Sequence, residues 1–395
     1  MHLDHTPEQA SLRQELRAYF EAMMTPEVRA ELSQGGEGGT LFRTLVRQMG
    51  SDGLLGIGWP VDVGGQGRPA TDQFIFFDEV QRAGAPFPFV TVNTVGPTLM
   101  RYGSDEQKAF FLPRILAGEL NVAIGYTEPE AGTDLASLRT RAVRDGDEYV
   151  INGAKVFTSG ANQADYVWLA CRTDAEAPKH RGISILLVPT DAPGFSWTPI
   201  VTVGDSVTTA TFYDNVRVPH TALVGPENEG WRMITNQLNH ERVGLAALGG
   251  LAQRLFEDVL AWSRSAPSAP SPGAAPMIDV GWVQLDLARC HAKLEAMKLL
   301  NWKMAAAAAS GELGAADSSA VKVFGTETMI EVYRLLLGVV GAAGYLRAGS
   351  PGAVLHGQLE RAARAAQINT FGGGVNDVQR EIVAAAGLKM ARHAR

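Results

Sequence analysis

Cysteine is scarce in this chain of 395 residues, with Cys171 and Cys290 as the only two thiols. They lie far apart in the sequence, and no CxxC pair occurs. This spacing disfavours a disulfide framework or a thiolate metal site. A chain without structural disulfides suits a reducing compartment, so we predict a cytoplasmic protein.

Long apolar runs and clustered charges are also absent. The longest apolar stretch, from Leu335 to Leu346, is short and broken by glycine, so we expect no membrane-spanning helix. The first residues lack the basic and apolar blocks of a signal peptide. Lysine and arginine are scattered and the net charge is -7, which argues against nucleic-acid binding. The histidines show no HxxxH or HExxH spacing, so we predict no metal site.

The hydrophobic periodicity changes twice along the chain. Helical spacing dominates from about residue 7 to 120, with Thr6 and Ser104 as possible N-caps. Short β-prone runs follow without helices between them, which predicts a compact antiparallel β domain or barrel. Helical spacing returns after Pro226, where we expect helices at about 229–263, 277–309, 315–339, 356–370 and 374–387. We therefore predict an α+β chain of three domains, at residues 1–120, 121–228 and 229–395.

Small residues, hydroxyls and turn-formers gather between Gly125 and Gly160. Such a stretch suits a surface where backbone and hydroxyl groups approach a flat, polar heterocycle closely. An ordinary strand-and-turn region is the alternative, and composition alone favours it.

Four motifs in a fixed order carry a family resemblance: Tyr126 to Asp134, Val150 to Lys155, Asn239 to Val243 and Phe371 to Arg380. Over nearly its whole length the chain resembles the acyl-CoA dehydrogenase family. The resemblance implies an N-terminal helical domain, a middle β-barrel and a C-terminal four-helix bundle, with FAD between barrel and bundle. The segments Gln73 to Glu79, Val92 to Thr98 and Leu299 to Lys303 are similar to a bacterial subgroup acting on CoA thioesters of bulky or steroid side-chain acids.

The resemblance implies α,β-dehydrogenation of an acyl-CoA thioester to the 2-enoyl-CoA, with FAD N5 taking the β-hydride. Many members carry the catalytic base on the C-terminal glycine turn, but Gly373 occupies that position here. A minority carry it on the first bundle helix, where Glu241 stands beside Arg242. We expect Glu241 to take the α-proton, with a pKa raised by desolvation. A surface glutamate paired with a neighbouring arginine is the alternative.

Other site residues follow from the same matches. Thr127 and Thr133 match positions that bond the flavin edge and a phosphate or CoA group, while Phe157 matches an aromatic that shields one flavin face. A core aromatic is the alternative for Phe157. The expected cofactor-binding residues are Tyr126, Thr127, Gly132, Thr133, Phe157, Thr158 and Ser159. The expected substrate-binding residues are Thr133, Asn239, Arg242, Gly373 and Gly374. The N–H near Gly373 would polarise the thioester carbonyl, although a plain helix-entry turn also fits these glycines.

The chain departs from many homotetrameric relatives where they contact a neighbour's FAD. Arg264 is not followed by their Arg-x-x-Phe-Gly motif, and Leu335 to Gly341 lacks a Gln and Gly pair that contacts the adenosine half. Val375 offers no hydroxyl where a threonine often contacts the flavin. We therefore expect a hetero-oligomer with a related acyl-CoA dehydrogenase chain, with a homo-oligomer as the alternative. The expected electron acceptor is an electron-transfer flavoprotein. A catalytically silent scaffold subunit and a flavin oxidase or monooxygenase are the competing functions.

Overall fold

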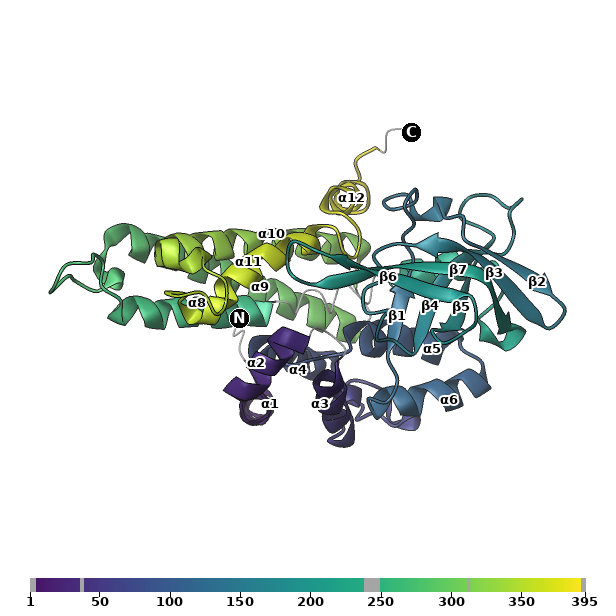
Figure 1. Cartoon of the computed structure of the whole chain (residues 1–395), viewed down its shortest axis with the longest axis horizontal. Helices are drawn as coiled ribbons and strands as arrows, with labels where there is room; N and C mark the ends of the chain where they lie inside the picture. The colour runs from purple at the N-terminus through teal and green to yellow at the C-terminus, as the bar shows by residue number, and fades with distance from the viewer. Residues whose placement is uncertain (1–4, 36–38, 238–248, 311–312, 392–395) are drawn as a thin grey trace.

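The computed structural model describes residues 5–35, 39–237, 249–310 and 313–391. Three layers of structure follow one another along the chain (Figure 1). A helical bundle lies at one end of the molecule and a β-sheet at the other, and the N-terminal helices run beneath both. The expected order of helices, sheet and helices is confirmed.

The N-terminal helices begin where the sequence offers capping groups. Thr6 Oγ1 accepts a hydrogen bond from the Gln9 N–H, and the Gln9 side chain accepts one from the Thr6 N–H. Ser104 and Gln107 form the same reciprocal pair, so both predicted N-caps are confirmed. The helices are α1 (Pro7–Met23), α2 (Pro26–Gly35), α3 (Thr40–Ser51), α4 (Ala70–Ala83), α5 (Gly96–Tyr102) and α6 (Asp105–Leu116), with a π-helical turn at Thr91–Val95 before α5.

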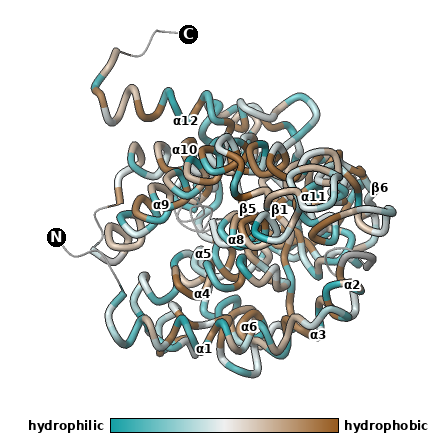
Figure 2. Tube along the Cα trace, turned by 90° about the vertical axis from the view of Figure 1, so that its left-hand side faces the viewer, coloured by the Kyte–Doolittle hydropathy of each residue, from teal (hydrophilic) through white to brown (hydrophobic). Residues whose placement is uncertain are grey.

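The described strands form one eight-stranded sheet, in the order β6-β7-β3-β2-β4-β5-β8, with β1 paired to β4. Most neighbours are antiparallel, as predicted, but β1–β4 and β2–β4 are parallel pairs that the sequence did not indicate. In the end-on view of Figure 2, hydrophobic stretches of β1 and β5 lie in the middle of the molecule. The strands are β1 (Val122–Gly125), β2 (Arg141–Asp145), β3 (Glu148–Lys155), β4 (Tyr166–Arg172), β5 (Ile183–Pro189), β6 (Phe195–Val201), β7 (Val207–Pro219) and β8 (Leu223–Val224).

The C-terminal helices pack around a core of their own, which is separate from the core shared by the N-terminal helices and the sheet. The expected helix over 356–370 is divided into α11 and a 3-10 segment at Ala366–Thr370. The first expected helix, 229–263, lies partly outside the described residues. The bundle contains α8 (Gly249–Ser265), α9 (Gly281–Ser310), α10 (Ala315–Val340) and α11 (Gln358–Ala365), and α12 (Asn376–Ile382) follows at the edge of the molecule.

The turn between β6 and β7 reaches the bundle (Figure 1). The Arg364 side chain on α11 donates to the Val203 carbonyl and, at 2.5 Å, to Asp205 Oδ2. Gly204 lies so close to the same helix that a Cβ atom there would come within 2.8 Å of Ala365 Cα. Charge pairing and close packing thus join the sheet to the bundle.

Candidate functional site

A buried lysine joins the two motifs that the sequence singled out on the sheet side. Lys155, at the end of β3, is only 1% exposed, and its Nζ lies 2.8 Å from Glu128 Oε1 and 3.0 Å from the Tyr126 carbonyl. Burial opposes the ionisation of Glu128, but the Lys155 charge and hydrogen bonds from Thr140 together lower the pKa of this carboxyl. The Val156 N–H also donates to the Thr127 carbonyl. These bonds hold residues 126–128 against 155–156.

Phe157 follows this junction in an unusual conformation. Its φ is 60°, a left-handed value that costs a bulky residue free energy, and the residue is 61% exposed. The exposure rules out a core aromatic, which was the alternative interpretation. A strained backbone that presents an exposed aromatic ring is typical of a ligand-binding surface.

Thr158 and Ser159, both predicted to bind the cofactor, occupy different environments. Thr158 is fully buried, its Oγ1 lies 3.3 Å from Thr211 Oγ1, and its N–H donates to the Thr209 carbonyl. Ser159 is exposed, with its Oγ 2.9 Å from Thr208 Oγ1. Of these two hydroxyls, that of Ser159 is therefore the one that a ligand can reach.

The remaining predicted cofactor residues divide in a similar way. Tyr126 is buried, its hydroxyl donates to Gln237 Oε1 at 2.6 Å, and it accepts from Trp168 Nε1 at 3.0 Å. Thr127 is half-buried, whereas Gly132 and Thr133 are exposed. Tyr126 therefore supports the stretch from within, and the other three residues lie nearer its surface.

The predicted substrate residues Gly373 and Gly374 form a turn before α12. Both have left-handed φ values, 65° and 94°, which glycine adopts at little cost. The side chain of Lys322 on α10 reaches this turn and donates to the Gly374 carbonyl at 2.9 Å. Lys322 lies in none of the sequence motifs. Its signal in the sequence is a row of polar residues spaced four apart, Ser318, Lys322 and Thr326, and the structure buries all three.

Asn239, Glu241 and Arg242 lie outside the described residues. The described chain on either side consists of helical residues 230–237 and helix α8 from Gly249 onward. The assignments of the base and its two neighbours therefore remain predictions.

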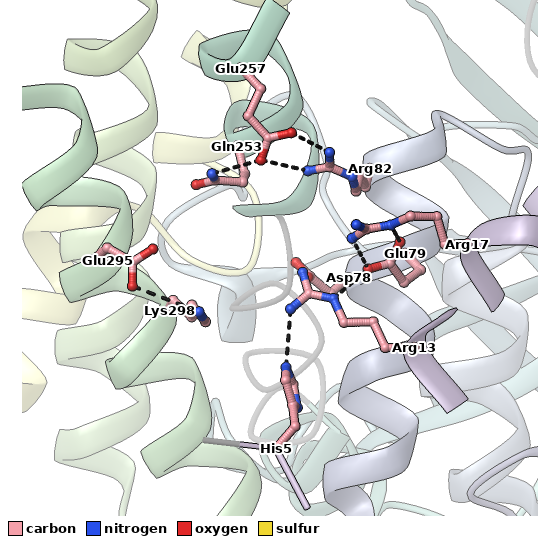
Figure 3. Close-up of polar contacts among 10 residues, drawn as sticks. All are labelled: His5, Arg13, Arg17, Asp78, Glu79, Arg82, Gln253, Glu257, Glu295 and Lys298. Atoms are coloured by element: carbon pink, nitrogen blue, oxygen red, sulfur yellow. Dashed lines mark hydrogen bonds and ion pairs between the residues drawn. The ribbon is translucent and has the colours of Figure 1, made fainter. Parts of the chain in front are cut away.

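A cavity of about 390 Å³ opens between α1, α4, α8 and α9. Charged residues pair with one another along its wall, as Figure 3 shows for Arg17 with Glu79 and Arg82 with Glu257. Burial raises the pKa of Asp78 to about 6, while Arg13, 3.4 Å away, acts in the opposite direction. The cavity thus marks an ion-paired junction between the N-terminal helices and the bundle.

Two expected absences can be examined in the part of the chain that the structure describes. No cluster of three or more His, Cys, Asp or Glu side chains within it is arranged to hold a metal ion. Among the described helices, none is long and apolar enough to cross a membrane.

Family comparisons agree with this arrangement along almost the full chain. Residues 6–119 match the acyl-CoA dehydrogenase N-terminal domain, residues 123–216 the middle domain and residues 228–388 the C-terminal domain. The chain belongs to the acyl-CoA dehydrogenase family. This acyl-CoA dehydrogenase therefore has the expected fold and belongs to a family of flavoproteins.

Individual relatives place the dehydrogenase more narrowly. It is 55% identical to acyl-CoA dehydrogenase FadE26 of Mycobacterium tuberculosis (strain ATCC 25618 / H37Rv), over 99% of both chains. It resembles the Tcur3481-Tcur3483 steroid ACAD with 60% identity and a TM-score of 0.94, over 100% of both chains. For the ChsE4-ChsE5 complex from Mycobacterium tuberculosis, the identity is 53% and the TM-score 0.93, again over 100% of both chains. These relatives confirm the resemblance to the bacterial steroid-type subgroup.

Proposed function

We propose that this dehydrogenase converts the CoA thioester of a bulky or steroid side-chain acid to its 2-enoyl-CoA, using FAD. The observation that carries this proposal is the full-length similarity to the steroid ACAD, at 60% identity and a TM-score of 0.94. A match over whole chains supports a shared reaction more strongly than a shared fold alone does.

The stretch between Gly125 and Gly160, the sheet-side stretch, fits a flat aromatic cofactor. Phe157 presents an exposed ring on a strained backbone, and Ser159 and Thr133 are exposed hydroxyls in the same stretch, residues 125–160. Gly132 adds no side chain that would block close approach. In this proposal Thr127, Gly132, Thr133, Phe157 and Ser159 face the cofactor, while Tyr126 and Thr158 support them from within. FAD, when bound, supplies the acceptor for the β-hydride at its N5 atom.

Residues on the bundle side hold and deprotonate the thioester. Glu241 removes the α-proton, and Asn239 and Arg242 contact the substrate beside it. The N–H groups of the turn at Gly373 and Gly374 donate to the thioester oxygen, which gains negative charge as the α-proton leaves. The loss of the proton and the loss of the hydride then leave the α,β double bond.

We further propose that the chain works in a hetero-oligomer with a related acyl-CoA dehydrogenase chain in the cytoplasm. The support is the missing Arg-x-x-Phe-Gly motif after Arg264, together with a relative whose structure is described as the ChsE4-ChsE5 complex. The electron acceptor would be an electron-transfer flavoprotein. The division into domains at 1–120, 121–228 and 229–395 belongs to the same proposal.

The decisive experiment is an anaerobic titration of the assembled enzyme with steroid side-chain and straight-chain acyl-CoA thioesters, following the flavin absorbance. The wild type should bleach, and bleaching should be strongest with the bulky thioester. Glu241→Gln should retain FAD but bleach about 10²- to 10⁴-fold more slowly, because the general base is lost. Glu21→Gln, which alters an exposed glutamate on α1, is the matched control and should behave like the wild type.

Three outcomes would contradict parts of the proposal. Undiminished bleaching in Glu241→Gln would remove the assignment of the base. Oxygen consumption in step with substrate oxidation would indicate a flavin oxidase instead. A fully active chain that carries one FAD per subunit without any partner would overturn the hetero-oligomer.

A further inference from the structure

Lys322 is a buried cation on α10 with only 2% of its surface exposed. Its Nζ lies 2.7 Å from Asn376 Oδ1, 2.9 Å from the Gly374 carbonyl and 3.3 Å from the Thr370 carbonyl. An ammonium group is costly to remove from water, so the acceptors around a buried one indicate which parts of the chain it holds in place.

Two of the carbonyls that accept hydrogen bonds from Lys322 lie at opposite ends of the turn that contains Gly373 and Gly374, the glycine turn. Thr370 ends the 3-10 segment before the turn, and Gly374 ends the turn itself. Within the turn, Gly373 and Gly374 have left-handed φ values and no side chains that restrain the backbone. One ammonium group thus spans the turn from Thr370 to Gly374 and fixes both ends to α10.

A second set of contacts fixes the start of α12 to the same helix. The Asn376 amide donates to Thr326 Oγ1 and to Glu327 Oε1, both at 3.1 Å. Arg380, on the next turn of α12, lies 2.5 Å from Glu327 Oε1. Val375, the N-cap of α12, makes no side-chain capping bond, so Asn376 and its partners on α10 hold this helix end. The turn is therefore held by Lys322 through its own carbonyls, and at its C-terminal end by the contacts of Asn376 with α10.

We propose that Lys322 is a positioning residue for the dehydrogenation. It holds the N–H groups of the turn in the orientation needed to bind the thioester oxygen as that oxygen becomes negative. Its positive charge lies one hydrogen bond from the turn, where it favours an anionic oxygen over a neutral one. This inference rests on the proposed function, in which the turn at Gly373 and Gly374 binds the thioester. Lys322 itself touches neither substrate nor cofactor in this proposal.

The test compares Lys322→Met with the wild type in the assembled, FAD-loaded enzyme. A 3-thia-acyl-CoA is the probe, because it can lose its α-proton but has no β-hydride to transfer. The deprotonated probe and the flavin together absorb at long wavelength. This absorbance, measured against pH, reports how readily the α-proton leaves. In Lys322→Met the midpoint of this pH titration should move to higher pH by about one unit. The kcat for the substrate should fall about tenfold to a hundredfold, with a smaller change in KM. FAD content should be unchanged.

Lys303→Met is the matched control, since Lys303 is an exposed lysine on α9 paired with Asp317. It should leave the midpoint and kcat as in the wild type. Asn376→Ala is the second variant and keeps the ammonium group while removing one of its acceptors. It should shift the midpoint in the same direction by a smaller amount, and it decides the matter if Lys322→Met does not fold.

The outcomes separate the two proposals. A folded, FAD-loaded Lys322→Met with an unchanged midpoint and kcat would overturn the positioning role. If only Asn376→Ala folds, an unchanged midpoint in that variant would do the same. A wild-type enzyme that never bleaches with any thioester would refute the proposed function, and the inference would fall with it.

Discussion

The sheet-side stretch and the glycine turn both contain unusual backbone that other residues hold in place, but they present different groups. Each is fastened by a buried lysine, Lys155 on the sheet side and Lys322 under the turn. Each also contains left-handed backbone, with φ of 60° at Phe157 and 94° at Gly374. The difference lies in what the backbone carries, because one side presents an aromatic ring and the other presents no side chain.

This difference indicates how each side is used. A large exposed ring on a strained backbone provides a surface for a flat ligand, and strain is maintained there because the surrounding bonds fix the chain. Glycine in a similar conformation costs little and leaves the peptide N–H groups open to close approach. Lys155 reaches the Glu128 carboxylate, and Lys322 reaches the backbone carbonyls of Thr370 and Gly374.

The largest effect is expected when the ion pair between Lys155 and Glu128 is broken. Lys155→Met leaves Glu128 buried without its cation, and removing one partner of a buried ion pair costs about 3–5 kcal/mol. We expect the free energy of unfolding to fall by about that amount in chemical denaturation, with loss of FAD. The double variant Lys155→Met/Glu128→Gln should recover part of the loss, because no unpaired charge remains. Equal losses in the single and double variants would show that the charge pair is not the cause.

A smaller effect is expected at Asp78, a half-buried carboxyl that lies outside both sides of the site. Burial raises its pKa to about 6, so the folded chain holds this proton more tightly than the unfolded chain does. Its contribution to stability is present at low pH and is lost as the pH rises from about 4 through 6. Asp78→Asn should remove this part of the pH dependence, worth up to about 3 kcal/mol, in unfolding measurements across that range. An identical pH slope in the variant and the wild type would contradict the assignment.

The smallest effects are expected at the two left-handed positions, and they should have opposite signs. Phe157→Gly relieves the strained backbone, so stability without cofactor should rise by about 1 kcal/mol while FAD retention falls. Gly374→Ala adds strain, and its Cβ would lie 2.5 Å from Gln379 Nε2, so stability should fall by about 1 kcal/mol or more. Thermal unfolding with and without FAD measures both variants. Changes of the same sign would remove the distinction between the two sides.

Local signals predicted much of the fold. Thr6 and Ser104 cap their helices because a hydroxyl followed three residues later by glutamine closes a local loop. Strand β2 is hard to recognise from the sequence because its residues are mostly polar and exposed and offer little hydrophobic pattern. The parallel pairing of β1 with β4 depends on contacts between distant residues, which no local pattern encodes.

The site was less accessible to sequence reasoning than the fold. Motif matches brought out Phe157 and Gly374, whose left-handed backbones support special roles. They did not separate the exposed Ser159 from the buried Thr158, because the direction of a side chain depends on tertiary packing. Lys322 lies 52 residues from Gly374, so its bond to the turn becomes visible only in three dimensions.

The β6–β7 turn fastened to α11 has a consequence for ligand binding. Because Arg364 and the close packing of Gly204 connect the sheet to the bundle, the spacing between these two domains is set by the chain itself. A molecule bound between them does not have to draw two independent bodies together. Its binding free energy is then available for orientation and chemistry, which is the advantage of a preorganised receptor.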